Sequence, residues 1–297
     1  MIMKQRLTRE DPGQTLSSVV SDRERERIAI RQAQARRRIL VATLSSVAVL
    51  GTLTFVIVAS PGWKVVKATF FDLSYGHQVL HLVTRGLLTN IELTVIAGIA
   101  IIICAMGLAL ARTSHSAAMA PFRILATVYV DVFRGIPLLL VIFLIGFGVP
   151  ALRIGGVTSN VTVLGTIAVI VTYSAYVAEV LRSGILSVHP SQRAAARSLG
   201  LTQSQTLRFV VLPQALKRVI PPLLNDLVAL LKDTGLVSIL GVTDAIRAAQ
   251  IEGSRTFNYT PYVVAAILFL LITVPLTRYT DYMLARSIER QNAQGAV

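Results

Sequence analysis

Charged side chains inside otherwise apolar segments are the residues of this sequence best placed to do chemistry. They come in pairs of opposite charge at short spacing: Asp131 with Arg134, Glu179 with Arg182, and Lys232 with Asp233. The first two pairs have the i,i+3 spacing that puts both side chains on one face of a helix, whereas adjacent helical residues face apart and need separate partners. A charge at the centre of a membrane costs about 2.5–3.5 kcal/mol on insertion scales. We therefore expect each group to meet a bundle interior, a cavity or another subunit.

Catalysis and metal binding have no such support in the residue pattern. His77 and His81 are four apart, a spacing that can bind metal on a helix, but no third ligand is nearby. The single cysteine, Cys104, lies in an apolar block and cannot form a disulfide within the chain. The sequence also has no G-x-x-x-x-G-K-[ST] phosphate loop, so it cannot itself be an ATPase. We predict a protein that is not an enzyme and holds no metal or cofactor of its own.

The elements that must position the charges follow from composition. Of the 297 residues, 54% are hydrophobic and 15% are charged, whereas soluble domains carry about 25% charged residues. One crossing of the bilayer needs about 20 mostly apolar helical residues. Six blocks are that long or nearly so: residues 39–59, 93–111, 135–152, 154–178, 219–242 and 260–277. We predict an all-α fold, a polytopic membrane helix bundle with about six transmembrane helices in a lipid bilayer.

The distribution of positive charge orients these six spans. With the N-terminus inside, 21 of the 29 Lys and Arg residues fall in cytoplasmic segments and 6 in outer ones. This asymmetry predicts that both termini are cytoplasmic. Ten of the basic residues lie in the tail, residues 1–38, which explains much of the net charge of +14. Because this tail has no aromatic residues on which bases could stack, we exclude nucleic acid as a partner.

The largest predicted cytoplasmic loop between spans, residues 187–218, contains two short helical segments. In the first, Pro190 suits an initial helical position and Gly200 suits the left-handed position that ends a helix. The second opens with Thr202 and Gln205 at the spacing of a capping box and is predicted to stop near Pro213. The pattern is that of a compact docking element; the alternative is a plain connecting loop.

The same segment resembles the EAA loop of ABC importer permeases. In that family Glu-Ala-Ala is followed by a glycine and, further on, by an aliphatic residue, any residue, Leu and Pro. The matching residues here are Ala194, Ala195, Ala196, Gly200, and then Val210-Val211-Leu212-Pro213. Ala194 stands where the family has Glu, so a polar contact made by that Glu is not expected in this chain.

The resemblance extends over roughly residues 85–285 and is closest to the polar amino-acid subfamily (histidine, glutamine, glutamate and arginine importers). Three further segments carry it: Arg134-Gly135-Ile136-Pro137-Leu138-Leu139, residues 176–185 from Tyr176 through Glu179 to Ile185, and Lys232-Asp233-Thr234-Gly235-Leu236. The family more often has Ser where this chain has Gly235. The order of all these motifs is that of the family.

The resemblance implies a permease core of five helices, preceded here by one extra helix. Composition gives a cytoplasmic basic tail (1–38) and a first transmembrane helix (39–59), and the resemblance adds a permease core (77–290) with the coupling loop 187–218. The resemblance implies two ATPase subunits, which bind ATP and magnesium, a second permease subunit, the same or homologous, and an extracytoplasmic amino-acid-binding protein. The resemblance also implies that the protein is located in a bacterial inner membrane.

Several alternatives remain open at this level. The intramembrane charges Asp131, Arg134, Glu179, Lys232 and Asp233 could line the substrate pathway, or could form structural pairs between helices or with the second permease. The permease could carry another small solute, such as an osmolyte. A self-contained secondary transporter would be expected to show an internal repeat with paired broken helices, which we do not find. The sequence names neither the amino acid nor the identity of the second permease.

Overall fold

The computed structural model describes residues 22–114 and 116–295, in two units. The first unit, Met1–Val65, is built on one long helix, α1 (Asp22–Ala59). The part of this helix from Arg36 to Ala59 is long and apolar enough to cross a membrane, as predicted for residues 39–59. The helix begins within the predicted basic tail, of which residues 1–21 lie outside the described residues.

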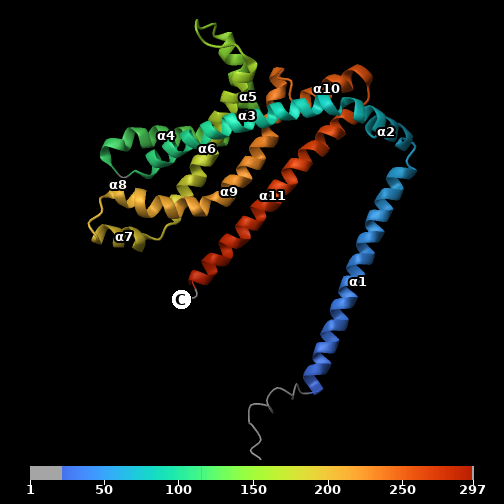
Figure 1. The fold of residues 1–297 in the computed structure, drawn as a ribbon, viewed down its shortest axis with the longest axis horizontal. Helices are drawn as coiled ribbons and strands as arrows, with labels where there is room; N and C mark the ends of the chain where they lie inside the picture. Colours follow the sequence, from blue (N-terminus) through green and yellow to red (C-terminus); the bar gives the residue numbers. More distant parts are fainter. Residues whose placement is uncertain (1–21, 115, 296–297) are drawn as a thin grey trace, which may run out of the picture. The chain divides into compact units, whose positions relative to one another are not determined.

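The second unit, Val66–Val297, consists of helices over the residues that the structure describes (Figure 1). After α2 (Trp63–Phe70), its elements in chain order are α3 (Leu73–Thr113), η1 (Ala117–Met119), α4 (Ala120–Gly135), α5 (Leu138–Ala151), α6 (Val161–Ser187), α7 (Pro190–Ser198), α8 (Gln203–Thr206), η2 (Leu207–Val211), α9 (Leu212–Asp233), η3 (Thr234–Leu240), α10 (Ala245–Thr256) and α11 (Thr260–Gly295).

Five of the six predicted membrane crossings correspond to helices that are long and apolar enough to span, when the bent pair is counted as one. Helices α1, α3, α6 and α11 contain segments long and apolar enough to span, and α4 with α5 forms a fifth crossing if the bent pair is one span. The sixth predicted crossing, residues 219–242, falls on α9 and the 3-10 helix η3. Helix α9 is not among the described helices that are long and apolar enough to cross a membrane; its segment carries Asp226, Lys232 and Asp233.

The third crossing begins earlier than predicted and is not straight. The sequence block starts at Gly135, but the helix pair starts at η1, and α4 and α5 are bent by 105° at the break between them. Ile136 is extended, with φ −99° and ψ 130°, because the residue before a proline avoids the helical region. Pro137 itself supplies no N–H and becomes the N-cap of α5. Asp131 and Arg134 therefore lie on α4, before the bend.

Helix α6 lies at the centre of the second unit, where α3, α4, α5 and α9 pack against it. Its buried face is lined by small residues, including Ala168, Ala175 and Ala178, which lets the neighbouring backbones approach. One close approach is to α9 at Gly184, where an added Cβ would lie 2.2 Å from Cγ1 of Val219. A side chain at this position would force the two helices apart.

A buried polar cluster joins α3 to the segment before α10. Asn90 and Asp244 are both 0% exposed, and the Asn90 Nδ2 donates to Asp244 Oδ2 at 3.0 Å and to Thr234 Oγ1 at 3.2 Å. The Asn90 Oδ1 accepts from the N–H of Ala245, and Asp244 caps α10 by accepting from the N–H of Arg247. Because these groups satisfy one another, the cluster fixes α3, η3 and α10 in one arrangement.

Candidate coupling loop and intramembrane charges

The predicted first helix of the loop is α7, and its two ends have the expected caps. Pro190 occupies the first helical turn after the N-cap residue His189, whose Nδ1 accepts from the N–H of Ser191 at 3.2 Å. At the other end Gly200 has φ +85°, the left-handed conformation that favours glycine. Its N–H donates to the carbonyl of Arg197, and the N–H of Leu201 donates to that of Ala196. This pair of bonds is a Schellman motif, which stops the helix sharply.

The helix offers a smooth outer face. Ala194 and Ala195 are exposed, whereas Ala196 is only 4% exposed and holds the helix against the rest of the loop. Leu199, just past the end of α7, is 81% exposed. Small exposed side chains beside one projecting aliphatic residue form a surface that another protein can approach closely.

The second predicted helix also begins as expected, with a complete capping box. Thr202 Oγ1 accepts from the N–H of Gln205 at 3.3 Å, and the Gln205 Oε1 accepts from the N–H of Thr202 at 2.9 Å. The predicted stop near Pro213 is wrong. The chain passes through the π-helical segment η2 and continues as α9, with Pro213 in its first turn. Proline has no N–H to donate, and a one-residue widening of the turn before it lets the helix continue.

Two arginines tie the loop to the end of α6. Arg193 donates from Nη2 to the carbonyl of Ile185 at 2.6 Å. Arg218, on α9, donates to the carbonyl and to the hydroxyl of Ser187. The end of α6 is thus bonded both to α7 and to α9. Leu212 and Pro213, at the start of α9, lie between these anchors in the chain.

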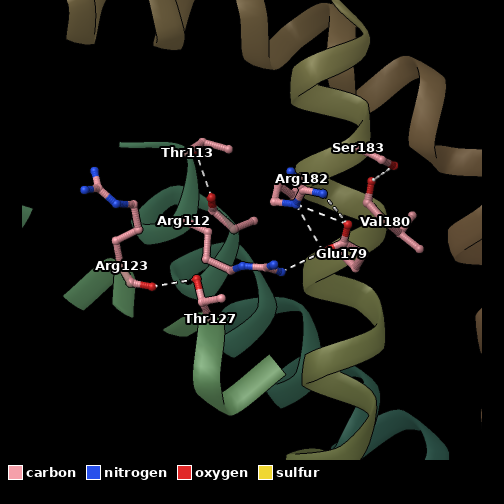
Figure 2. Close-up of polar contacts among 9 residues, drawn as sticks. Arg112, Thr113, Arg123, Thr127, Glu179, Val180, Arg182 and Ser183 are labelled. Carbon is pink, nitrogen blue, oxygen red and sulfur yellow. Dashed lines mark hydrogen bonds and ion pairs between the residues drawn. The ribbon is translucent and has the colours of Figure 1, made fainter. Parts of the chain in front are cut away.

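Glu179 is the most strongly paired of the predicted intramembrane charges. Arg182 lies one turn along α6 and donates to the Glu179 carboxylate at 2.5 Å, as the i,i+3 spacing predicts. Arg112, in the last turn of α3, donates to the other oxygen at 2.6 Å. Figure 2 shows the two guanidinium groups directed at one carboxylate from different helices. The side chains of Arg112 and Glu179 are 12% and 22% exposed, so this ion pair links α3 and α6 out of bulk solvent.

Lys232 and Asp233 face apart, as expected for helical neighbours. The Asp233 Oδ2 accepts a hydrogen bond from the Tyr173 hydroxyl of α6 at 2.7 Å. Lys232 is exposed on α9. Within the same helix, Oδ2 of Asp226 is buried and has no hydrogen-bond partner among the described residues. The Asp226 carboxylate on α9 can therefore still accept a hydrogen bond.

Asp131 and Arg134 are not brought together as a pair. Both are exposed on α4, and the ion pairs recorded among the described residues involve neither. The contact recorded for Arg134 is through its carbonyl, which accepts from the Tyr176 hydroxyl at 3.3 Å. Their exposure leaves both charges available to a neighbour or to the pathway, rather than to each other.

Sequence reasoning missed two partners that the structure supplies. Arg112 was counted only as a cytoplasmic basic residue, and Tyr173 was not singled out. Both contacts join residues that are far apart in the sequence: 67 positions separate Arg112 from Glu179, and 60 separate Tyr173 from Asp233. Local spacing carries no signal for such pairs; only the requirement that each buried charge find a partner pointed to their existence.

Comparison with known proteins gives a family match and several relatives. Residues 105–288 match the family described as "binding-protein-dependent transport system inner membrane component". The probable glutamine ABC transporter permease protein GlnM of Bacillus subtilis is 38% identical over 55% of this chain and 74% of its own length. The putative glutamine transport system permease protein GlnP of Rickettsia conorii is 33% identical over 70% of this chain and 92% of its own. The arginine transport system permease protein ArtQ of Bacillus subtilis is 30% identical over 70% and 91%.

Solved structures repeat the architecture of the second unit. A crystal structure of an amino acid ABC transporter with histidines matches with a TM-score of 0.66 and 31% identity, covering 72% of this chain and 98% of that one. An inward-facing structure of the MetNI methionine ABC transporter matches with a TM-score of 0.58 at 19% identity, covering 69% and 95%, and so agrees in fold.

Proposed function

This chain belongs to the family of binding-protein-dependent transport system inner membrane components, and from that membership we propose that it is the permease subunit of an ATP-driven amino-acid importer. Relatives named as glutamine and arginine permeases support amino acids as the substrate class. Glutamine and arginine differ in side-chain charge, so the relatives favour polar amino acids as a class over either one. The observation that carries the proposal is the loop 187–218, which presents a capped helix, α7, that is bonded to the end of α6, as is the first part of α9.

In this proposal α7 is the element on which an ATPase subunit docks. Ala194 and Ala195 provide the contact face, Ala196 the buried support, and Gly200 the turn that sets the direction of the helix. Leu212 and Pro213 begin the helix that carries motion away from the docking face. ATP and magnesium are bound by the ATPase, and this chain carries no cofactor.

The assembly and orientation complete the proposal. Two permease subunits, the same or homologous, form the pathway, two ATPase subunits dock on the cytoplasmic loops, and an extracytoplasmic binding protein delivers the amino acid. Both termini of this chain are cytoplasmic, as the asymmetry of basic residues favours. The permease core, residues 77–290, forms the pathway, and residues 1–38 and 39–59 serve as tail and additional membrane helix.

The unpaired intramembrane charges are the proposed pathway residues. An amino acid crossing the membrane carries an ammonium and a carboxylate, and both need partners in a medium with little water. Asp131, Arg134 and Lys232 are exposed, so they remain free to serve such groups or a second permease. Glu179 and Asp233 are engaged by Arg112, Arg182 and Tyr173, and would act by holding the helices that line the path.

ATP hydrolysis by the reconstituted complex tests the function. The permease, its ATPase and the binding protein are placed in vesicles, and hydrolysis is measured with each amino acid and with an osmolyte such as glycine betaine. We expect hydrolysis to be stimulated by one or a few polar amino acids. Stimulation by the osmolyte alone would replace the amino-acid assignment, and accumulation of solute by the permease without the ATPase would contradict an ABC mechanism.

Two variants test the docking face within the same assay. Ala195→Glu puts a bulky charge on the proposed contact face and should abolish stimulated hydrolysis and transport while membrane insertion stays normal. Ala195→Ser, which is nearly the same size, serves as the matched control and should retain both. Normal transport by Ala195→Glu at normal expression would contradict docking through α7.

A further inference from the structure

A cavity of about 690 Å³ lies between the end of α3 and the helices of the loop. One side consists of residues of α3, of η1 and of the segment between them, and the other of residues of α7, α8 and η2, with Ile185 of α6. Its volume falls in the range of about 300–1,000 Å³ that is typical of small-molecule sites. Two arginines, Arg193 and Arg197, line it, and none of the described lining residues is acidic. The cavity is therefore electropositive.

Two residues that line this cavity each have a buried polar atom without a hydrogen-bond partner among the described residues. The two atoms are Nε of Arg193 and Oγ1 of Thr206. Thr206 as a whole is 5% exposed. A buried polar group without a partner is unfavourable, so such groups usually meet a water, an ion or a ligand. Both unpaired atoms can donate a hydrogen bond, and the guanidinium adds a positive charge.

The backbone beside the cavity has an uncommon form. The π-helical segment η2 begins directly after Thr206, and its first and last residues, Leu207 and Val211, line the cavity. Short π-helical segments occur often at functional sites. Leu110 and Met119 on the opposite side give the cavity an apolar wall.

We propose that this cavity binds the oxyanion group of a small amphipathic molecule, a carboxylate or a phosphate. Arg193 Nε and Thr206 Oγ1 donate to the oxyanion, Arg197 adds the second positive charge, and the apolar part lies against Leu110 and Met119. An oxyanion supplies acceptors alone, which matches walls that offer donors and positive charge. The molecule could come from the cytoplasm as a free anion or from the inner leaflet as a lipid headgroup.

Occupancy of this site would regulate coupling. The oxyanion would join α7 and α8 to the end of α3, which is otherwise held to α6 through Arg112 and Glu179. A bound molecule would thus stiffen the loop against the membrane helices. This consequence depends on the proposed coupling function; the binding itself does not.

Thermal melting of the purified full-length chain tests the binding. The chain is studied without the ATPase, so that no nucleotide site can take up the probe, and inorganic phosphate is titrated at constant ionic strength with chloride as the balancing anion. We expect a saturable rise in melting temperature, as for any ligand that binds the folded state. In Arg197→Gln the apparent Kd should rise about tenfold, the effect of losing roughly one charge-assisted contact.

Arg208→Gln is the matched control, because Arg208 is exposed on the same loop and does not line the cavity. It should respond to phosphate like the parent. Thr206→Val distinguishes binding of phosphate by the hydroxyl from a purely structural role of that hydroxyl. Removing an unpaired buried hydroxyl should raise the melting temperature without phosphate and weaken the response to it.

A second arm separates the two sources of oxyanion. The chain is placed in nanodiscs of phosphatidylcholine with or without phosphatidylglycerol. A stabilisation by phosphatidylglycerol that Arg197→Gln loses would identify a lipid headgroup; a response to phosphate in both nanodiscs would identify a free anion. Responses of Arg197→Gln and Thr206→Val equal to the parent under every condition would overturn the proposal. If phosphate binding is not found, the proposed importer function can still be supported by substrate-stimulated hydrolysis. If substrate-stimulated hydrolysis is not found, phosphate binding can still be measured.

Discussion

At the scale of single residues, the Glu179 carboxylate is shared between Arg112 and Arg182. Because Arg112 comes from α3 and Glu179 from α6, their bond is tertiary, whereas the bond to Arg182 is local to one helix. The tertiary bond should contribute more to stability, since it joins two elements and its Arg112 side chain is the less exposed of the two arginines. Exposed pairs on one helix contribute about 0.3–0.5 kcal/mol.

A double-mutant cycle measures this difference. Glu179→Gln and Arg112→Gln should each destabilise the folded chain, and their coupling energy should fall within about 0.5–3 kcal/mol. The matched cycle with Arg182→Gln should give a smaller coupling. Thermal melting of the four proteins in each cycle provides the values. Equal coupling in the two cycles would mean that the contact between α3 and α6 adds nothing beyond the local pair.

At the scale of elements, the end of α7 depends on the left-handed backbone of Gly200. A β-branched residue in that conformation costs about 1–2 kcal/mol. Gly200→Val should therefore alter the direction of the loop and abolish transport while leaving insertion intact. Gly200→Asn should retain most activity, because Asn tolerates this conformation. Transport assays on both variants at matched expression decide the point. Loss in both would indicate that the side chain itself collides with a partner.

Helix α9 is the second element whose role can be tested. Lys232→Met and Asp233→Asn should impair transport more than Glu92→Gln, because Glu92 is exposed near one end of α3's apolar segment. Tyr173→Phe should resemble Asp233→Asn if the hydrogen bond to α6 is what matters. Uptake and substrate-stimulated hydrolysis are measured together. If both α9 variants show the uptake rate and the substrate preference of the parent protein, α9 does not line the pathway.

Elements with local signals were predictable, and elements set by distant contacts were not. The cap of α7, the capping box at Thr202 and the turn at Gly200 each depend on residues within a few positions, and the structure confirms all three. The continuation of the helix past Pro213 was missed because a proline in the first turn resembles a stop. The bend of 105° between α4 and α5 was not predicted, because residues 135–152 were treated as one span.

The candidate site divides in the same way. The Glu179–Arg182 bond follows from spacing, whereas the Arg112 and Tyr173 contacts follow from how α3, α6 and α9 pack. The cavity beside the loop could not be predicted, because its walls come from segments nearly a hundred positions apart. A sequence shows which buried groups need partners, and the fold decides which partners they meet.

At the scale of the whole molecule, the orientation in the membrane is open to direct test. In a Cys104→Ala background, a cysteine at Ser159, between α5 and α6, should react with an impermeant thiol reagent from outside. A cysteine at Gln291, near the end of α11, should react only after the membrane is opened. Labelling of Gln291 in intact cells would contradict a cytoplasmic C-terminus and with it the proposed topology.

The length of α3 has a consequence for how the second unit moves. Its 41 residues would measure about 60 Å as a straight helix, roughly twice the thickness of the hydrocarbon core. The C-terminal end of α3 borders the electropositive cavity, and about a third of the way along the helix from its other end Gly86 passes Asp244 so closely that an added Cβ would lie 2.4 Å from the Asp244 backbone. Helix α3 is thus one long continuous element that is held by close packing against α10 and the segment before it. We therefore expect a movement of α3 beside the coupling loop to be accompanied by a displacement of α10, which packs against the same helix.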